Sequence, residues 1–133
     1  MLRGLTTVSF FADDLDAARA WYTELLGVEP YFVRDGYLEW RFGDYQHELG
    51  IVDGRYSPHP GGTAPGGVVT YWHVDDVVAA REHLLAHGAT DHQGVIERGE
   101  GFVTTSVVDP FGNVVGLMYN PHYLEVLSHR QEH

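Results

Sequence analysis

The segment "DDLDAAR" at residues 13–19 recurs as "DDVVAAR" at residues 75–81, and five of its seven positions are identical. Both copies have the composition of a helix start, because an Asp side chain can accept hydrogen bonds from the first backbone N–H groups of a helix. A common helix start would explain the echo by itself. A duplicated unit predicts more, namely that the same elements surround each copy, so the order of elements decides between the two interpretations.

The elements around the first copy read β-α-β-β-β. Residues 5–11 are rich in β-branched and aromatic side chains and predict a strand. The helix that follows ends at Gly27, and one of its faces carries Leu15, Ala18, Tyr22, Leu25 and Leu26. Three short strands come next, separated by Asp-Gly and Gly-Asp turns. They are expected at residues 30–34, 37–42 and 47–52.

The second copy has the same surroundings. A strand at 68–74 and a helix that closes at Gly88 are followed by strands at 92–98, 102–108 and 114–119. The matched order favours a duplication within one domain. We expect module one at about 4–54, a Gly- and Pro-rich linker at about 55–66 and module two at about 67–121. The tail, residues 122–133, is expected to add one helical turn or to fray.

Composition excludes several kinds of chemistry and partner. The 133 residues suit one compact domain, and they include neither Cys nor Lys, which excludes disulfides, thiolate nucleophiles and lysine Schiff bases. A net charge of −11 argues against nucleic acid and anionic membrane surfaces as partners. No apolar run is long enough to span a membrane, and the N-terminus lacks a signal-type apolar core. We therefore expect a cytoplasmic protein.

Three segments resemble one known family. They are "FADDLDAARAWYTELLGVEP", "VDDVVAAREHLLAHGAT" and "VVDPFGNVVGL", and the likeness extends from about residue 5 to residue 120. The chain is similar to the vicinal oxygen chelate superfamily, which includes glyoxalase I, bleomycin- and fosfomycin-resistance proteins and extradiol dioxygenases. The resemblance implies an α+β fold of two βαβββ modules that curl around a common cleft, with the helices outside. It also implies a small-molecule ligand and a homodimer, side by side or module-swapped.

The resemblance also indicates where metal-using relatives hold their ion, with one His or Glu from each of four strands. Here the four positions fall on Thr7, Glu48, Val69 and Gly116. Only Glu48 is a good ligand, whereas a durable divalent site needs at least three protein donors. We therefore expect no metal and no other cofactor. His83 and His87 are spaced to clamp an ion on the second helix, but surface histidines are the expected reading there.

The cleft itself is read from strand alternation in register with those four positions. Tyr71 and His73 either orient a ligand or line an ordinary half-buried strand, and Arg41 could bind an anionic or carbonyl group. The expected ligand-binding residues are Thr7, Ser9, Phe11, Arg41, Val69, Tyr71, His73, Gly116 and Met118.

Glu48 is the single candidate catalytic residue. On an apolar cleft wall it could act as a general base or accept a hydrogen bond from a ligand, and it could equally be a relic acid paired with Arg41. The leading hypothesis is a metal-free small-molecule binding protein that sequesters a toxic metabolite or antibiotic. The alternative is a lyase, isomerase or dioxygenase-like enzyme that uses Glu48 as base or within a non-standard metal site. A non-catalytic module that assembles with another protein is the third hypothesis.

Overall fold

The structure is a computed structural model that describes residues 1, 3, 5–56 and 69–131. The chain divides into two compact units, Met1–Thr63 and Ala64–His133, and each is described by itself. Most of the expected linker lies outside the described residues. Its first two positions belong to a short 3-10 turn, η1 (Gly54–Tyr56).

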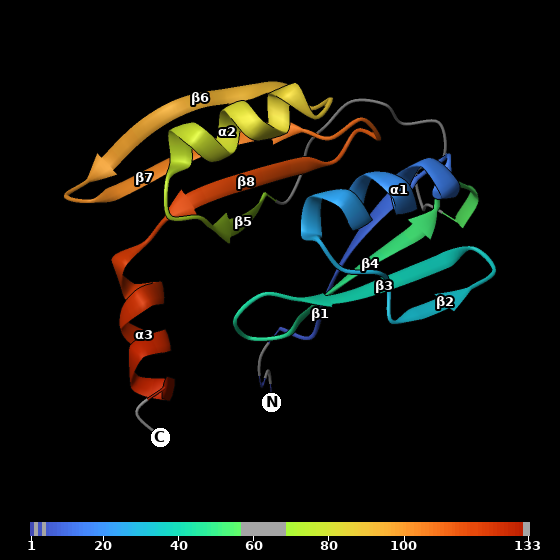
Figure 1. Ribbon diagram of the computed structural model, residues 1–133, viewed down its shortest axis with the longest axis horizontal. Coiled ribbons are helices and arrows are strands. Elements are labelled where there is room, and N and C mark those ends of the chain that lie inside the picture. The colour runs from blue at the N-terminus through green and yellow to red at the C-terminus, as the bar shows by residue number, and fades with distance from the viewer. Residues whose placement is uncertain (2, 4, 57–68, 132–133) are drawn as a thin grey trace. The chain divides into compact units, whose positions relative to one another are not determined.

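The N-terminal unit is a four-stranded sheet with a helix on one face (Figure 1). Its strand order is β1-β4-β3-β2, with β1 parallel to β4 and the other neighbours antiparallel. The elements are β1 (Thr7–Ala12), α1 (Leu15–Leu26), β2 (Phe32–Arg34), β3 (Tyr37–Phe42) and β4 (His47–Asp53).

The C-terminal unit repeats this topology. Its strand order is β5-β8-β7-β6, again with the first strand parallel to its neighbour and the rest antiparallel. The elements are β5 (Thr70–His73), α2 (Val77–Ala86), β6 (Thr90–Gly99), β7 (Phe102–Val108), β8 (Val114–Tyr119) and α3 (Pro121–Gln131). The matching strand orders confirm the duplication predicted from the echoed helix starts, and with it the two-module α+β fold.

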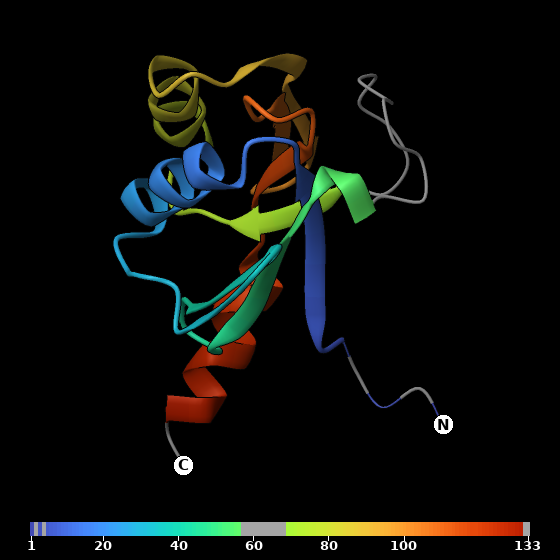
Figure 2. The same cartoon turned by 90° about the vertical axis from the view of Figure 1, so that its right-hand side faces the viewer.

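Alternation along the strands separates a buried face from an open one in the N-terminal sheet. The buried face packs on α1, which lies to one side of the strands in Figure 2. Trp40 and Tyr22 are completely buried there, and Trp21 meets Tyr22 edge-on at 4.7 Å between ring centroids. The helix face predicted from Ala18 and Tyr22 is confirmed, and the structure widens it to include Trp21. The functional question therefore concerns the opposite face of the sheet.

The repeated Asp residues perform the same task in both units. The Asp14 carboxylate accepts a hydrogen bond from the Ala17 N–H, and the Asp76 carboxylate accepts one from the Ala79 N–H, each at 3.0 Å. An N-cap of this kind stabilises a helix by about 1 kcal/mol. The motif therefore marks architecture, and both of its copies act at the start of a helix.

The C-terminal tail is more ordered than the sequence predicted. Instead of a single turn, α3 runs for 11 residues and extends from the end of β8 (Figures 1 and 2). Asn120 begins it, because its side chain accepts from the His122 N–H at 2.9 Å. Tyr123 then stacks on the His73 ring at 4.4 Å. Among the described residues, no helix combines the length and apolar character needed to cross a bilayer.

Candidate functional site

The open face of the N-terminal sheet carries a row of polar side chains. Strand register places Thr7 opposite Glu48 and Glu48 opposite Arg41, so these three residues cross the sheet from β1 through β4 to β3. The next row along the strands contains Ser9, Gly50 and Glu39 in the same order. Sequence reasoning predicted this face for Thr7, Ser9, Glu48 and Arg41, and the structure brings them onto one surface.

Glu48 is held from two sides. Its Oε2 accepts from the Thr7 hydroxyl at 3.1 Å, and its Oε1 accepts from the Arg41 guanidinium, whose Nε and Nη2 both lie at 3.3 Å. The Tyr31 hydroxyl lies 3.5 Å from the same Oε1. The Glu48 side chain keeps 23% of its surface exposed. It is thus a positioned carboxylate that solvent or a ligand can still reach.

Glu39 is the second carboxylate of the face, and two phenols converge on it. The Tyr37 hydroxyl donates to Oε1 at 2.5 Å, and the Tyr31 hydroxyl donates to Oε2. Because Tyr31 also approaches Glu48, its hydroxyl lies between the two carboxylates. We call the six residues Thr7, Tyr31, Tyr37, Glu39, Arg41 and Glu48 the polar cluster.

The environment keeps both phenols in their protonated, donating form. Burial raises the pKa of Tyr37 first, and its hydrogen bond to Glu39 raises it further. For Tyr31 the order is reversed, since the hydrogen bond to Glu39 is the main cause of its raised pKa. The pKa of the Arg41 guanidinium is also raised, chiefly by its charge interaction with Tyr31 and then by its contacts with Glu48. At neutral pH the cluster thus contains two phenol donors and one permanent cation.

Gly50 allows Tyr37 to reach Glu39. A Cβ at position 50 would lie 2.5 Å from the Tyr37 phenolic oxygen and 2.9 Å from a ring carbon. Such distances are well inside van der Waals contact, so only glycine leaves room for this ring. Gly50 is therefore part of the cluster's support although it has no side chain of its own.

The predicted residues of the C-terminal unit lie on its own sheet. Tyr71 is opposite Gly116 and His73 is opposite Met118, while Val69 precedes β5. The Tyr71 ring covers Gly116, where a Cβ would lie 2.6 Å from a ring carbon. Tyr71 itself remains 39% exposed. This face therefore offers an aromatic surface beside a glycine, with the side chains of Ser106 and His92 hydrogen-bonded to each other nearby on β7 and β6.

His73 makes several contacts within its own unit. Its side chain is only 8% exposed, and the Asn120 N–H donates to Nδ1 at 3.3 Å. The Tyr123 ring stacks on it, and Nε2 lies 3.5 Å from an Asp75 carboxylate oxygen. These contacts join β5 to the start of α3, and they describe a residue that fastens the tail helix. Met118 is half-buried beside it and accepts a weak hydrogen bond from the Asn120 amide.

Three of the four positions that the resemblance associates with a metal offer little to coordinate one. Glu48 and the Thr7 hydroxyl are hydrogen-bonded to each other, and Val69 has no donor atom. At Gly116 the Tyr71 ring fills the space that a ligating side chain would need. Among the described residues, no group of three or more His, Cys, Asp or Glu side chains is arranged to bind an ion. In the part of the chain that the structure describes, no third side chain of these types joins His83 and His87, whose rings stack on each other on α2.

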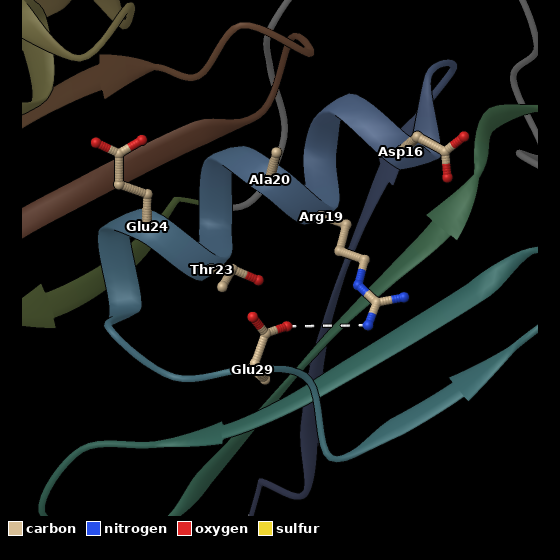
Figure 3. Close-up of a pocket in the computed structure, with 6 residues that line it drawn as sticks. All are labelled: Asp16, Arg19, Ala20, Thr23, Glu24 and Glu29. Atoms are coloured by element: carbon tan, nitrogen blue, oxygen red, sulfur yellow. Dashed lines mark ion pairs between the residues drawn. The ribbon is translucent and has the colours of Figure 1, made fainter.

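A shallow hollow lies away from the polar cluster, beside α1 (Figure 3). Its lining is charged and open, and the Arg19 guanidinium reaches Glu29 across it at 3.9 Å. The lining residues are Asp16, Arg19, Ala20, Thr23, Glu24 and Glu29. None of them takes part in the polar cluster, so we assign the candidate site to the open sheet face.

Sequence reasoning missed Tyr31 and underused Tyr37 and Glu39. Alternation along residues 37–42 puts Tyr37 and Glu39 on the same face as Arg41, and that signal is sufficient to include them. Tyr31 falls in the strand expected at residues 30–34, but β2 begins only at Phe32, so Tyr31 itself precedes the strand. Its backbone N–H nevertheless donates to the Glu39 carbonyl at 3.0 Å, which extends the ladder by one residue and brings the phenol over the sheet.

Comparison with solved structures supports the fold assignment. A glyoxalase-related enzyme from Fulvimarina pelagi is 20% identical, with 90% of each chain covered and a TM-score of 0.71. Lactoylglutathione lyase from Agrobacterium tumefaciens is 23% identical, with 91% of this chain and 96% of that chain covered and a TM-score of 0.66. A glyoxalase/bleomycin resistance protein from Catenulispora acidiphila is 24% identical, with 89% and 100% covered and a TM-score of 0.61. At these identities the likeness concerns the fold alone.

A search of curated proteins found no match. At the level of family, residues 4–117 match the Glyoxalase/Bleomycin resistance protein/Dioxygenase superfamily, which is most of the chain. The matched span includes the first β-α-β-β-β repeat, the second repeat as far as Leu117 in β8, and every member of the polar cluster. The chain belongs to the Glyoxalase/Bleomycin resistance protein/Dioxygenase superfamily.

Proposed function

We propose that this protein binds a small organic molecule on the open face of its N-terminal sheet, without a metal ion. The observation that carries the proposal is the polar cluster, in which Thr7, Tyr31 and Arg41 hold Glu48 where it is still partly exposed. A small number of polar groups that converge beside aromatic rings is typical of small-molecule sites. The apolar contact would come from Phe32, which lies 6.2 Å from the Tyr37 ring and 6.3 Å from the Tyr31 ring.

The fit of the residues explains why we propose binding without metal. A metal ion would have to displace the hydrogen-bond donors that Glu48 now has. Of the other three positions, Thr7 offers a hydroxyl, whereas Val69 and Gly116 have no donor atom in a side chain. A sequestering role requires only binding, so it suits a face with acceptors and aromatic rings but few metal ligands. The toxic metabolite or antibiotic that we expected as cargo belongs to this proposal, as does assembly into a homodimer.

The test is a ligand screen on chelator-treated protein. Ligand-observed NMR with a fragment collection would identify binders, each of which is then measured again with Glu48→Gln and with added Zn²⁺, Ni²⁺ or Mn²⁺. We expect binding without metal and at least a tenfold loss in Glu48→Gln, because a charged hydrogen bond is worth about 1.5–3 kcal/mol. The matched control is Glu82→Gln, an exposed acid on α2. Binding that requires metal, or that ignores position 48, would contradict the proposal.

A second candidate function is catalysis with Glu48 as the base. The observation in its favour is the path from Glu48 through the Tyr31 hydroxyl to Glu39, along which a proton can move between two carboxylates. An enzyme of this kind would convert a ligand found by the screen, and product would be followed by NMR over time. Glu48→Gln should then abolish turnover while binding persists. Turnover that survives the change would exclude Glu48 as the base.

A further inference from the structure

One carboxylate of the polar cluster keeps open positions for hydrogen-bond donors. Tyr31, Tyr37, Thr7 and Arg41 all direct their N–H or O–H groups at the two carboxylates. A carboxylate has about four lone-pair positions. Glu39 accepts from two phenols, which leaves about two positions open on it. The cluster therefore keeps acceptor positions open on Glu39, while its three hydroxyl donors are already directed at carboxylates and only the Arg41 guanidinium has further N–H groups to offer.

The charges of the cluster point the same way. Glu39 and Glu48 outweigh the single cation Arg41, in a chain whose net charge is −11. This net negative charge would repel an anionic ligand and attract a cationic one, both during its approach and once it is bound. The aromatic faces add to this preference, because ring quadrupoles attract cations placed over them.

Arg41 shows how a cation sits in this place. Its guanidinium carbon lies 4.3 Å from the centroid of the Tyr31 ring, and its nitrogens lie 3.3 Å from Glu48 Oε1. The side chain is nevertheless 52% exposed, so little else fixes it. A tethered group that is stacked, paired and half in solvent can be displaced by a free group of the same chemistry.

We propose that the polar cluster is a subsite for organic cations, and that the Arg41 guanidinium is its built-in occupant. The ligand would carry a guanidinium or protonated amine on an apolar body. Its cationic group would take the place of Arg41 between the Tyr31 ring and Glu48, and further N–H groups would reach the open positions of Glu39. The apolar body would lie along Phe32, which faces the same side of the sheet as Glu39. This inference rests on the proposed function and specifies the class of its ligand.

The experiment compares phenylguanidine with phenylurea, which has nearly the same shape and no charge, and with phenylacetate as an anion. Each is titrated by NMR into the wild-type protein, Arg41→Ala, Glu48→Gln and Arg55→Ala. Arg55→Ala is the matched control, since Arg55 also lies over a tyrosine ring, at 4.9 Å, and pairs with an acid, Asp53, outside the cluster.

Removal of the tethered competitor should strengthen phenylguanidine binding about tenfold in Arg41→Ala and leave it unchanged in Arg55→Ala. Glu48→Gln should abolish it, and phenylurea should bind at least about tenfold more weakly than phenylguanidine. Equal affinity for the charged and neutral probes, or no gain in Arg41→Ala, overturns the inference. If only phenylacetate binds, and does so at the cluster, the cation preference is refuted while the proposed small-molecule site stands. If none of the probes binds any variant, the cation inference fails, and the fragment screen decides the proposed function separately.

Discussion

Replacement of Gly50 by Ala tests whether close approach of Tyr37 is what arranges the polar cluster. The new Cβ would stand 2.5 Å from the Tyr37 oxygen and 2.9 Å and 3.0 Å from two ring carbons. Either the ring stays and the site is overpacked, at a cost of about 1–3 kcal/mol, or the ring swings away and its hydrogen bond to Glu39 is lost. That second loss is about 1.5–3 kcal/mol for a bond to a charged acceptor. Both routes predict a fall of about 1–3 kcal/mol in the free energy of unfolding.

The double-mutant cycle with Tyr37→Ala separates this clash from any general effect of alanine. Without the ring, Ala at position 50 should be neutral or stabilising by about 0.5–1 kcal/mol, because glycine weakens a strand. Urea unfolding followed by tryptophan fluorescence would give the midpoints, which are compared at constant slope. Gly99→Ala is the control, since a Cβ there meets no atom within 4 Å. An equal cost of Gly50→Ala with and without the Tyr37 ring would refute the reasoning.

Three further predictions concern the rest of the chain. The pKa of Tyr37 is raised in the folded state, so its contribution to stability is complete below a pH of about 10 and is lost as the pH rises through the pKa of the folded state. Tyr37→Phe should remove the step at highest pH from the phenolate absorbance curve, and an unchanged curve would contradict this. Arg81→Met should lower the free energy of unfolding in urea by about 1.5–3 kcal/mol, because its guanidinium donates to the Thr105 hydroxyl at 2.9 Å and to two backbone carbonyls. Arg19→Met removes only an exposed ion pair at 3.9 Å and should cost less than about 0.5 kcal/mol. Equal costs would show that the hydrogen bonds of Arg81 are not formed. Tyr123→Ala should speed amide hydrogen exchange in α3 by removing the stack on His73, while Tyr123→Phe should preserve protection; identical exchange in the two variants would exclude the stack as the anchor.

The sequence predicted the fold well because each of its signals is local. Alternation along residues 37–42 puts Tyr37, Glu39 and Arg41 on the face opposite Leu38 and Trp40, and Leu38 and Trp40 are the buried ones. Two strands of the second unit, at 102–108 and 114–119, have the predicted bounds. The tail helix was underpredicted because its anchor is the His73 ring, which is 50 residues away from Tyr123 in the chain and forms no periodic pattern with it. Contacts of this kind depend on folding, and no window of residues contains them.

The candidate site was harder to predict because the two sheets share a geometry but differ in the side chains around it. In both sheets a glycine on the central strand lies beneath a tyrosine ring, Gly50 under Tyr37 and Gly116 under Tyr71. The first ring comes from the antiparallel neighbour β3, whereas the second comes from the parallel neighbour β5. Only the first ring holds a carboxylate, Glu39, within a network that reaches Glu48.

Counting from the repeated Asp residues therefore locates the four positions that the resemblance associates with a metal, but it does not locate the other side chains that surround Glu48. In the N-terminal sheet these side chains include Tyr31 and Arg41, which meet because β2 pairs with β3 after the helix. The Tyr31 ring and the Glu48 carboxylate are groups that hold a cation, as they hold the Arg41 guanidinium. In the function that we propose, the Tyr31 ring and Glu48 recognise an organic ligand on the open face of the N-terminal sheet, and no metal takes part.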